Sequence, residues 1–175
     1  QYIREEGPKG HQKKAGTPTM GGVLITIAII VPTLLWADLS NTYIWLAIFS
    51  TIAFGAIGFA DDYIKVVRKR NLGLTGRTKL VLQFLAAGFV GVALVTLTAT
   101  RQYSTHLMVP FFKQFRPDLV IESFRHYPHV WWLAFIPFVL FVMLVLVGSS
   151  NAVNLTDGLD GLAIGCTVIA AGALT

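Results

Sequence analysis

The sequence predicts an all-α polytopic membrane protein, and three observations support that fold class. Hydrophobic residues make up 54% of the 175 residues, whereas charged residues make up only 13%. Soluble domains carry roughly 25% charged residues, so lipid is the expected solvent for this chain. The charged residues are clustered, which leaves long uncharged stretches between them. These stretches do not alternate apolar and polar residues, and this favours helices over the strands of a barrel.

Four uncharged stretches are long enough to span a membrane as helices, and a fifth begins at residue 161. The stretches cover residues 15–37, 39–60, 80–100, 130–156 and 161–175. A helix needs about 20 apolar residues to cross the hydrocarbon core. We therefore expect a single integral membrane domain over residues 1–175, with spans near 21–37, 43–60, 80–99, 131–148 and 162–175. Pro32 and Pro137 fall inside two of the expected spans, where a membrane helix tolerates a kink.

The distribution of lysine and arginine predicts the orientation of these spans. Four basic residues lie in the tail 1–20 and six in the segment 61–79, whereas the long segment 101–130 holds the other four. The positive-inside rule then makes 1–20, 61–79 and 149–161 cytoplasmic, and makes 101–130 an external loop. Because the net charge of +5 comes from these segments between spans, it is a topology signal, and no nucleic-acid partner is expected.

A lysine- and glycine-containing segment, residues 13–22, comes directly before the first expected span. Backbone N–H groups at a helix N-terminus bind anions, and nearby lysines add positive charge. The segment therefore suits a phosphate-bearing ligand. The alternative interpretation is a basic anchor at the lipid headgroups.

Two adjacent carboxylates, Asp61 and Asp62, follow the second expected span. They lie in a segment whose other charged residues are all basic. Such a pair offers oxygen ligands for Mg²⁺, or one ligand and one general base. Lys65 lies one helical turn further on, where it can pair with them or with a phosphate. A solvated helix end at the interface is the alternative interpretation.

The third polar segment covers residues 151–161, between the last two expected spans. Its residues Asn154, Asp157 and Asp160 are spaced by three, which places them along one face of a helix. Polar groups packed between apolar spans are a functional hypothesis by default, although structural turn chemistry is an alternative. A calcium-binding loop is excluded because the segment lacks the terminal Glu. The single cysteine, Cys166, excludes an internal disulfide and a cysteine-rich metal site.

All three polar segments fall on the face that charge counting makes cytoplasmic. Carboxylates, lysines and backbone donors at a water–lipid boundary suit the metal-assisted transfer of a phosphate group. Such a site suits one water-soluble nucleotide substrate and one lipid substrate.

At these segments the sequence resembles the polyprenyl-phosphate N-acetylhexosamine-1-phosphate transferases, which are of glycosyltransferase family 4 type. The resembling motifs are Gly16-Thr17-Pro18-Thr19-Met20-Gly21-Gly22, Phe59-Ala60-Asp61-Asp62-Tyr63-Ile64-Lys65, and the run from Asn151 through Ala163. The first is similar to the version in the branch that acts on a muramoyl substrate. Relatives that act on UDP-N-acetylglucosamine usually carry a different version. The resemblance extends along the whole chain.

The resemblance implies transfer of phospho-MurNAc-pentapeptide from UDP-MurNAc-pentapeptide to undecaprenyl phosphate, with release of UMP and a requirement for Mg²⁺. It implies a location in the bacterial cytoplasmic membrane, among membrane lipid, with the active site on the cytoplasmic face. Family members are often dimers, so a homodimer is an expected assembly.

The same resemblance implies roles for particular residues. Asp61 and Asp62 would lie at the reaction centre as Mg²⁺ ligands, with one of them, left open here, deprotonating the lipid phosphate. Lys65 would hold phosphate, and Lys79 is a weaker candidate for that role. The other implied substrate-binding residues are Lys14 and Thr19 at the nucleotide end, and Asn154, Leu155, Asp157 and Asp160 at the nucleoside–sugar region.

One departure from the family concerns length. Family members are roughly twice as long, with about ten spans, and carry a further metal-binding Asp and a His-rich motif later in the chain than residue 175. We therefore expect this chain to be the N-terminal half of a longer protein.

Three alternatives give different expectations. A sister transferase using UDP-N-acetylglucosamine would share the mechanism and differ in substrate. An ion-coupled transporter predicts acidic residues near the middle of spans, whereas here they lie at span ends. A non-catalytic membrane scaffold leaves the three polar motifs without a reason.

Overall fold

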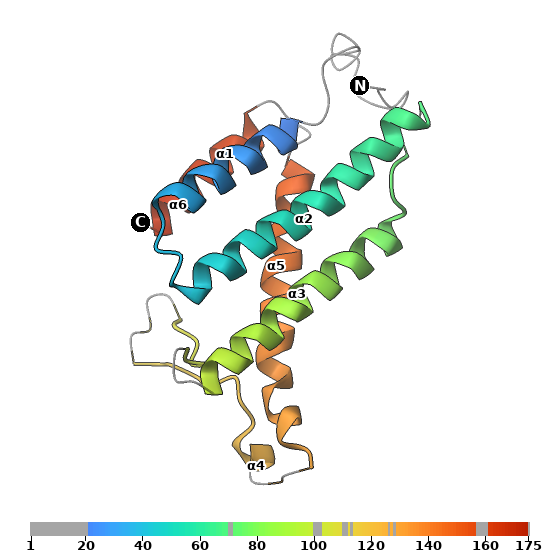
Figure 1. Ribbon diagram of the computed structural model, residues 1–175. Helices are drawn as coiled ribbons and strands as arrows, with labels where there is room; N and C mark the ends of the chain where they lie inside the picture. Colours follow the sequence, from blue (N-terminus) through green and yellow to red (C-terminus); the bar gives the residue numbers. More distant parts are fainter. Residues whose placement is uncertain are drawn as a thin grey trace. The chain divides into compact units, whose positions relative to one another are not determined.

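The structure, a computed structural model, is helical and confirms the predicted all-α fold class (Figure 1). It describes residues 21–69, 72–99, 103–109, 112, 114–125, 127, 129–156 and 161–174. The helices are α1 (Gly21–Trp36), α2 (Thr42–Val67), α3 (Gly76–Ala99), α4 (Glu122–Arg125), the 3₁₀ helix η2 (Trp131–Phe135), α5 (Ile136–Thr156) and α6 (Leu162–Leu174). Within these described ranges, the extended pairing consists of an isolated antiparallel bridge between His106 and Asp118.

Three helices are long and apolar enough to cross a membrane, namely Thr42–Val67, Gly76–Thr98 and Trp131–Thr156. Two shorter apolar helices cover Gly21–Trp36 and Leu162–Ala173. The 26 residues of α2 correspond to about 39 Å of helix, which exceeds a hydrocarbon core of roughly 30 Å. A helix of that length has room for its last turns outside the hydrocarbon. The five expected spans and their cytoplasmic or external sides stay predictions.

The chain divides into two compact units, Gln1–Ala86 and Ala87–Thr175, which we describe separately. In the first unit, α1 packs on α2. Gly55 of α2 permits this approach, because a Cβ built there would lie 3.3 Å from Oγ1 of Thr26 in α1. The helices are joined by a turn in which Oδ1 of Asp38 accepts hydrogen bonds from the backbone N–H of Ser40 at 3.0 Å and from its hydroxyl at 2.6 Å. Asn41 caps α2 by accepting from the backbone N–H of Tyr43 at 2.9 Å.

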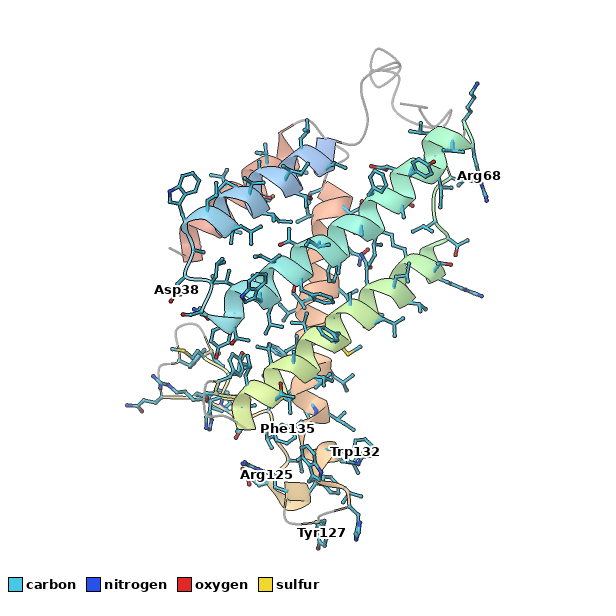
Figure 2. All side chains as sticks on the ribbon, viewed as in Figure 1. Asp38, Arg68, Arg125, Tyr127, Trp132 and Phe135 are labelled. Carbon is cyan, nitrogen blue, oxygen red and sulfur yellow. The ribbon has the colours of Figure 1, made fainter. Side chains whose placement is uncertain are left out.

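In the second unit, the end of α3 packs on α5. A Cβ built at Gly91 would lie 3.1 Å from Cγ1 of Val139, so glycine lets the two helices approach closely. The loop between these helices is closed by a hydrogen bond of 2.6 Å from the Thr105 hydroxyl to Asp118. Arg125, Tyr127, Trp132 and Phe135 lie together at one end of this unit (Figure 2).

Candidate functional site

The acidic pair lies on a helix because α2 continues past Ala60 to Val67. Nζ of Lys65 lies 2.6 Å from Oδ2 of Asp61 and 2.9 Å from Oδ1 of Asp62. These contacts follow from the sequence spacing, since residues three and four apart are neighbours on a helix surface. The structure therefore brings together three of the predicted site residues, and a single ammonium group bridges both carboxylates.

Asp61 is also held by the connection between α2 and α3. The backbone N–H of Leu74 donates a hydrogen bond of 2.7 Å to Oδ1 of Asp61. Gly73 lies so close to α2 that a Cβ built on it would be 2.6 Å from the backbone oxygen of Asp61. Both carboxylate oxygens of Asp61 thus have protein partners, and its side chain is only 14% exposed.

Asp62 has a different environment, although it is the next residue in the chain. Its side chain is 44% exposed, about three times the exposed fraction of Asp61. Within the described part of the chain, its polar contact is with Lys65, through Oδ1. Asp62 is therefore the more accessible carboxylate of the pair for a ligand arriving from outside α2.

Lys79 brings a second positive charge to this cluster. Thr75 directly precedes α3 and caps it, because its hydroxyl accepts from the backbone N–H of Thr78 at 3.2 Å and its carbonyl accepts from the backbone N–H of Lys79 at 3.0 Å. Lys79 is then close enough for its charge to act on the Asp61 carboxylate. Two carboxylates and two ammonium groups therefore share this end of the first unit.

The carboxylate pair has the chemistry of a partial magnesium site. Mg²⁺ prefers oxygen ligands, and proteins usually hold it with one or two carboxylates together with waters and substrate phosphates. Asp61 and Asp62 fit that requirement, with Asp62 the more accessible of the two. Nowhere in the described ranges, this pair included, is there a group of three or more His, Cys, Asp or Glu side chains able to hold a metal, so the pair would supply only part of a coordination shell.

The remaining predicted site residues are in the second unit or outside the described residues. Asn154 and Leu155 lie in the last turn of α5, and both are exposed. The same helix carries Asn151, whose amide donates a hydrogen bond of 2.8 Å back to the carbonyl of Val147. The predictions for Lys14, Thr19, Asp157 and Asp160 fall outside the described residues.

Sequence reasoning missed Gly73 and Leu74 as parts of this site. The relevant group of Leu74 is its backbone N–H, which every residue except proline possesses, so residue type gave no signal. Glycine in a short connection between two helices is a weak signal for a close backbone approach. That signal identifies Gly73 only after its neighbour on α2 is known.

Comparison with known proteins agrees with the motifs. A model of the family described as Glycosyl transferase family 4 matches residues 44–175. A further model, described as Phospho-N-acetylmuramoyl-pentapeptide-transferase signature 1, matches residues 14–25.

Curated relatives match along the whole chain. Proteins named phospho-N-acetylmuramoyl-pentapeptide-transferase from Koribacter versatilis, Acidobacterium capsulatum and Solibacter usitatus are 71%, 69% and 58% identical to it over 175 residues. Each alignment covers 100% of this chain and 46% of the relative, so the chain spans about half the length of these relatives. The matched family model covers most of the sequence, and the chain belongs to glycosyl transferase family 4.

Proposed function

We propose that this chain is part of a phospho-N-acetylmuramoyl-pentapeptide transferase. The reaction would transfer phospho-MurNAc-pentapeptide from UDP-MurNAc-pentapeptide to undecaprenyl phosphate, forming lipid I and UMP. The names of the relatives and the signature match over residues 14–25 support this substrate. The observation that carries the proposal is the cluster of Asp61, Asp62 and Lys65 at the end of a long apolar helix. A polar cluster there is accessible both to a soluble nucleotide and to a lipid phosphate.

In the proposed reaction, an oxygen of the lipid phosphate attacks the phosphorus next to the sugar, and the bond from that phosphorus to UMP breaks. Catalysis of such a transfer is largely a matter of positioning and charge stabilisation. Lys65 and Lys79 supply positive charge for phosphate oxygens. The aspartate pair accepts the proton of the lipid phosphate, with Asp62 presenting the more exposed carboxylate.

Asp61 and Asp62 are the residues in the described part of the chain that would hold Mg²⁺. The metal, when bound, would neutralise negative charge on the phosphate oxygens. Lys14 and Thr19 are proposed to contact the nucleotide, and Asn154, Leu155, Asp157 and Asp160 the nucleoside–sugar region, as the family resemblance implies.

The proposed location is the bacterial cytoplasmic membrane, with the chain crossing it several times and the reaction on the cytoplasmic side. The apolar helices support a multi-pass arrangement. The sidedness rests on the ten basic residues in segments 1–20 and 61–79.

The test uses the protein expressed from its complete gene and purified in detergent. Undecaprenyl phosphate and Mg²⁺ are supplied with either UDP-MurNAc-pentapeptide or UDP-N-acetylglucosamine, and UMP release is followed. We expect UMP from the muramoyl substrate alone. Release from the glucosamine substrate alone would move the protein to the sister branch. Failure of both substrates in a folded protein would refute the enzyme assignment, and cation transport would then be measured.

A further inference from the structure

We infer that Gly73 and the backbone amide of Leu74 form a positioning element that fixes the Asp61 carboxylate within the aspartate pair. The inference deepens the proposed function and relies on it where turnover is measured. The contact itself is independent of that function, because it is a hydrogen bond between the α2–α3 connection and α2. Neither residue belongs to the three motifs that carry the family resemblance.

The first step is that residue 73 must lack a side chain. A Cβ there would overlap Oδ1 of Asp61 and would lie 2.6 Å from the backbone oxygen and 2.7 Å from the Cγ of the same residue, whereas real Cβ atoms essentially never approach closer than 3.0 Å. The oxygen belongs to the backbone of α2 and cannot move aside without disturbing the helix. A side chain at residue 73 therefore has to displace the connection instead.

The second step is that displacing the connection removes the Leu74 amide from Asp61. This amide is a fixed backbone donor, and it holds Oδ1 at 2.7 Å while Lys65 holds Oδ2 at 2.6 Å. Two donors on the two oxygens define the orientation of the carboxylate plane. Without the amide, the carboxylate is held by a flexible lysine side chain that is itself shared with Asp62.

The third step concerns catalysis. A displacement of about 1 Å in a reacting or ligating group costs on the order of 100-fold in rate. The connection therefore contributes to turnover through the orientation of Asp61. Gly73 is accordingly a positioning residue.

The chain offers a matched control for this glycine. Gly76 lies three residues further on, at the start of α3, and a Cβ built there meets nothing within 4 Å. Gly73→Ala and Gly76→Ala thus make the same chemical change three residues apart, one against Asp61 and the other in open space. Both are made in the protein expressed from its complete gene, with Asp61 intact and with Asp61→Ala.

The first readout is the melting temperature in detergent, which needs no activity. We expect Gly73→Ala to lower it more with Asp61 intact than in the Asp61→Ala background, because only the former has the carboxylate that the added Cβ displaces and that the Leu74 amide binds. Gly76→Ala should give the same small change in both. An equal fall for Gly73→Ala in the two backgrounds would overturn the inference, since the clash with the backbone oxygen of residue 61 alone would then explain the loss.

The second readout is turnover per folded protein, measured on the monodisperse fraction. Gly73→Ala should lower kcat by on the order of 10- to 100-fold with KM for the nucleotide substrate within about threefold. Gly76→Ala should keep both values close to those of the parent. An unchanged kcat in folded Gly73→Ala would overturn the positioning role.

Leu74→Pro tests the hydrogen bond apart from the clash, because it removes the N–H while keeping the glycine, and it also serves if Gly73→Ala with Asp61 intact does not fold. Its loss of melting temperature should again depend on Asp61, and independence from Asp61 would overturn the inference. The positioning role and the proposed function can also be refuted independently of each other. A loss of melting temperature that depends on Asp61, in a protein whose parent form shows no transferase activity, would support the contact and refute the proposed function.

Discussion

Asp61 and Leu74 are 13 positions apart in the chain, yet the backbone N–H of Leu74 donates a hydrogen bond of 2.7 Å to Oδ1 of Asp61. The contact links the end of α2 to the connection that leads into α3. The aspartate pair is therefore supported from two directions, by Lys65 on its own helix and by the backbone of the following segment. The two carboxylates consequently differ in freedom.

Replacing either aspartate of the pair should lower turnover much more than folded yield. We expect Asp61→Asn and Asp62→Asn to reduce kcat by on the order of 100-fold or more, because each removes a negative charge from the proposed reaction centre. Asp38→Asn is the matched control. Asp38 lies in the turn before α2, whereas the pair lies near Arg68, at the other end of that helix (Figure 2). UMP release per folded protein is the measurement. Parent-like turnover in both variants of the pair would refute the assigned role.

Lys65→Met should destabilise the end of α2 as well as lower turnover. The variant leaves two adjacent carboxylates without the ammonium group that bridges them at 2.6 and 2.9 Å. Because the groups are partly exposed, each pair is worth roughly 0.2–1 kcal/mol. Melting temperature in detergent and UMP release are both measured. Arg68→Gln, at the exposed end of the same helix, is the control, and an equal effect from the two changes would contradict the bridging role.

The turn between α1 and α2 should show a pH-dependent contribution to stability. The hydroxyl and backbone N–H of Ser40 donate to Asp38 and hold the pKa of that carboxyl below its usual value of 3.8. The charged form is thus favoured in the folded protein, so its contribution is fully present above the usual pKa and is lost as the pH falls through the lowered pKa. The melting-temperature difference between the parent and Asp38→Asn should therefore shrink below about pH 4. A difference that stays constant down to pH values near 3 would contradict this account.

Adding a side chain at Gly91 should weaken the packing of α3 on α5. A Cβ at this position would lie 3.1 Å from Cγ1 of Val139, and overpacking of this kind costs about 1–3 kcal/mol. Gly91→Ala should lower the melting temperature clearly. Gly88→Ala is the matched control, because its nearest neighbour would be Cε of Met143 at an ordinary 3.6 Å. Equal losses in the two variants would show that Gly91 is not a site of close approach.

The sequence was sufficient for the fold class, because long uncharged stretches separated by clustered charges leave helices as the structure that satisfies the backbone in lipid. Helix ends were harder to predict. Charge patterning ended the second span at Ala60, whereas α2 continues to Val67. Charge ends a membrane span without ending a helix, and Lys65 stabilises the continuation by pairing with residues one turn earlier.

The candidate site was predictable to the extent that it depends on helical spacing. The pairing of Lys65 with Asp61 and Asp62 follows from intervals of four and three residues. The contact with Leu74 was not predictable, because it depends on the path of the connection and on a backbone donor that has no residue-specific signature. Exposure likewise separates Asp61 from Asp62 only in the folded chain, since both have the same chemistry in the sequence.

The ion pairs of Lys65 also bear on how the protein is made. A nascent α2 without Lys65 would carry two uncompensated negative charges at the edge of the bilayer, whereas with Lys65 the trio carries a net charge of −1. Intramembrane acidic residues oppose insertion of a helix from the translocon, and pairing reduces that cost. We therefore expect Lys65 to assist insertion of α2 before any substrate is bound.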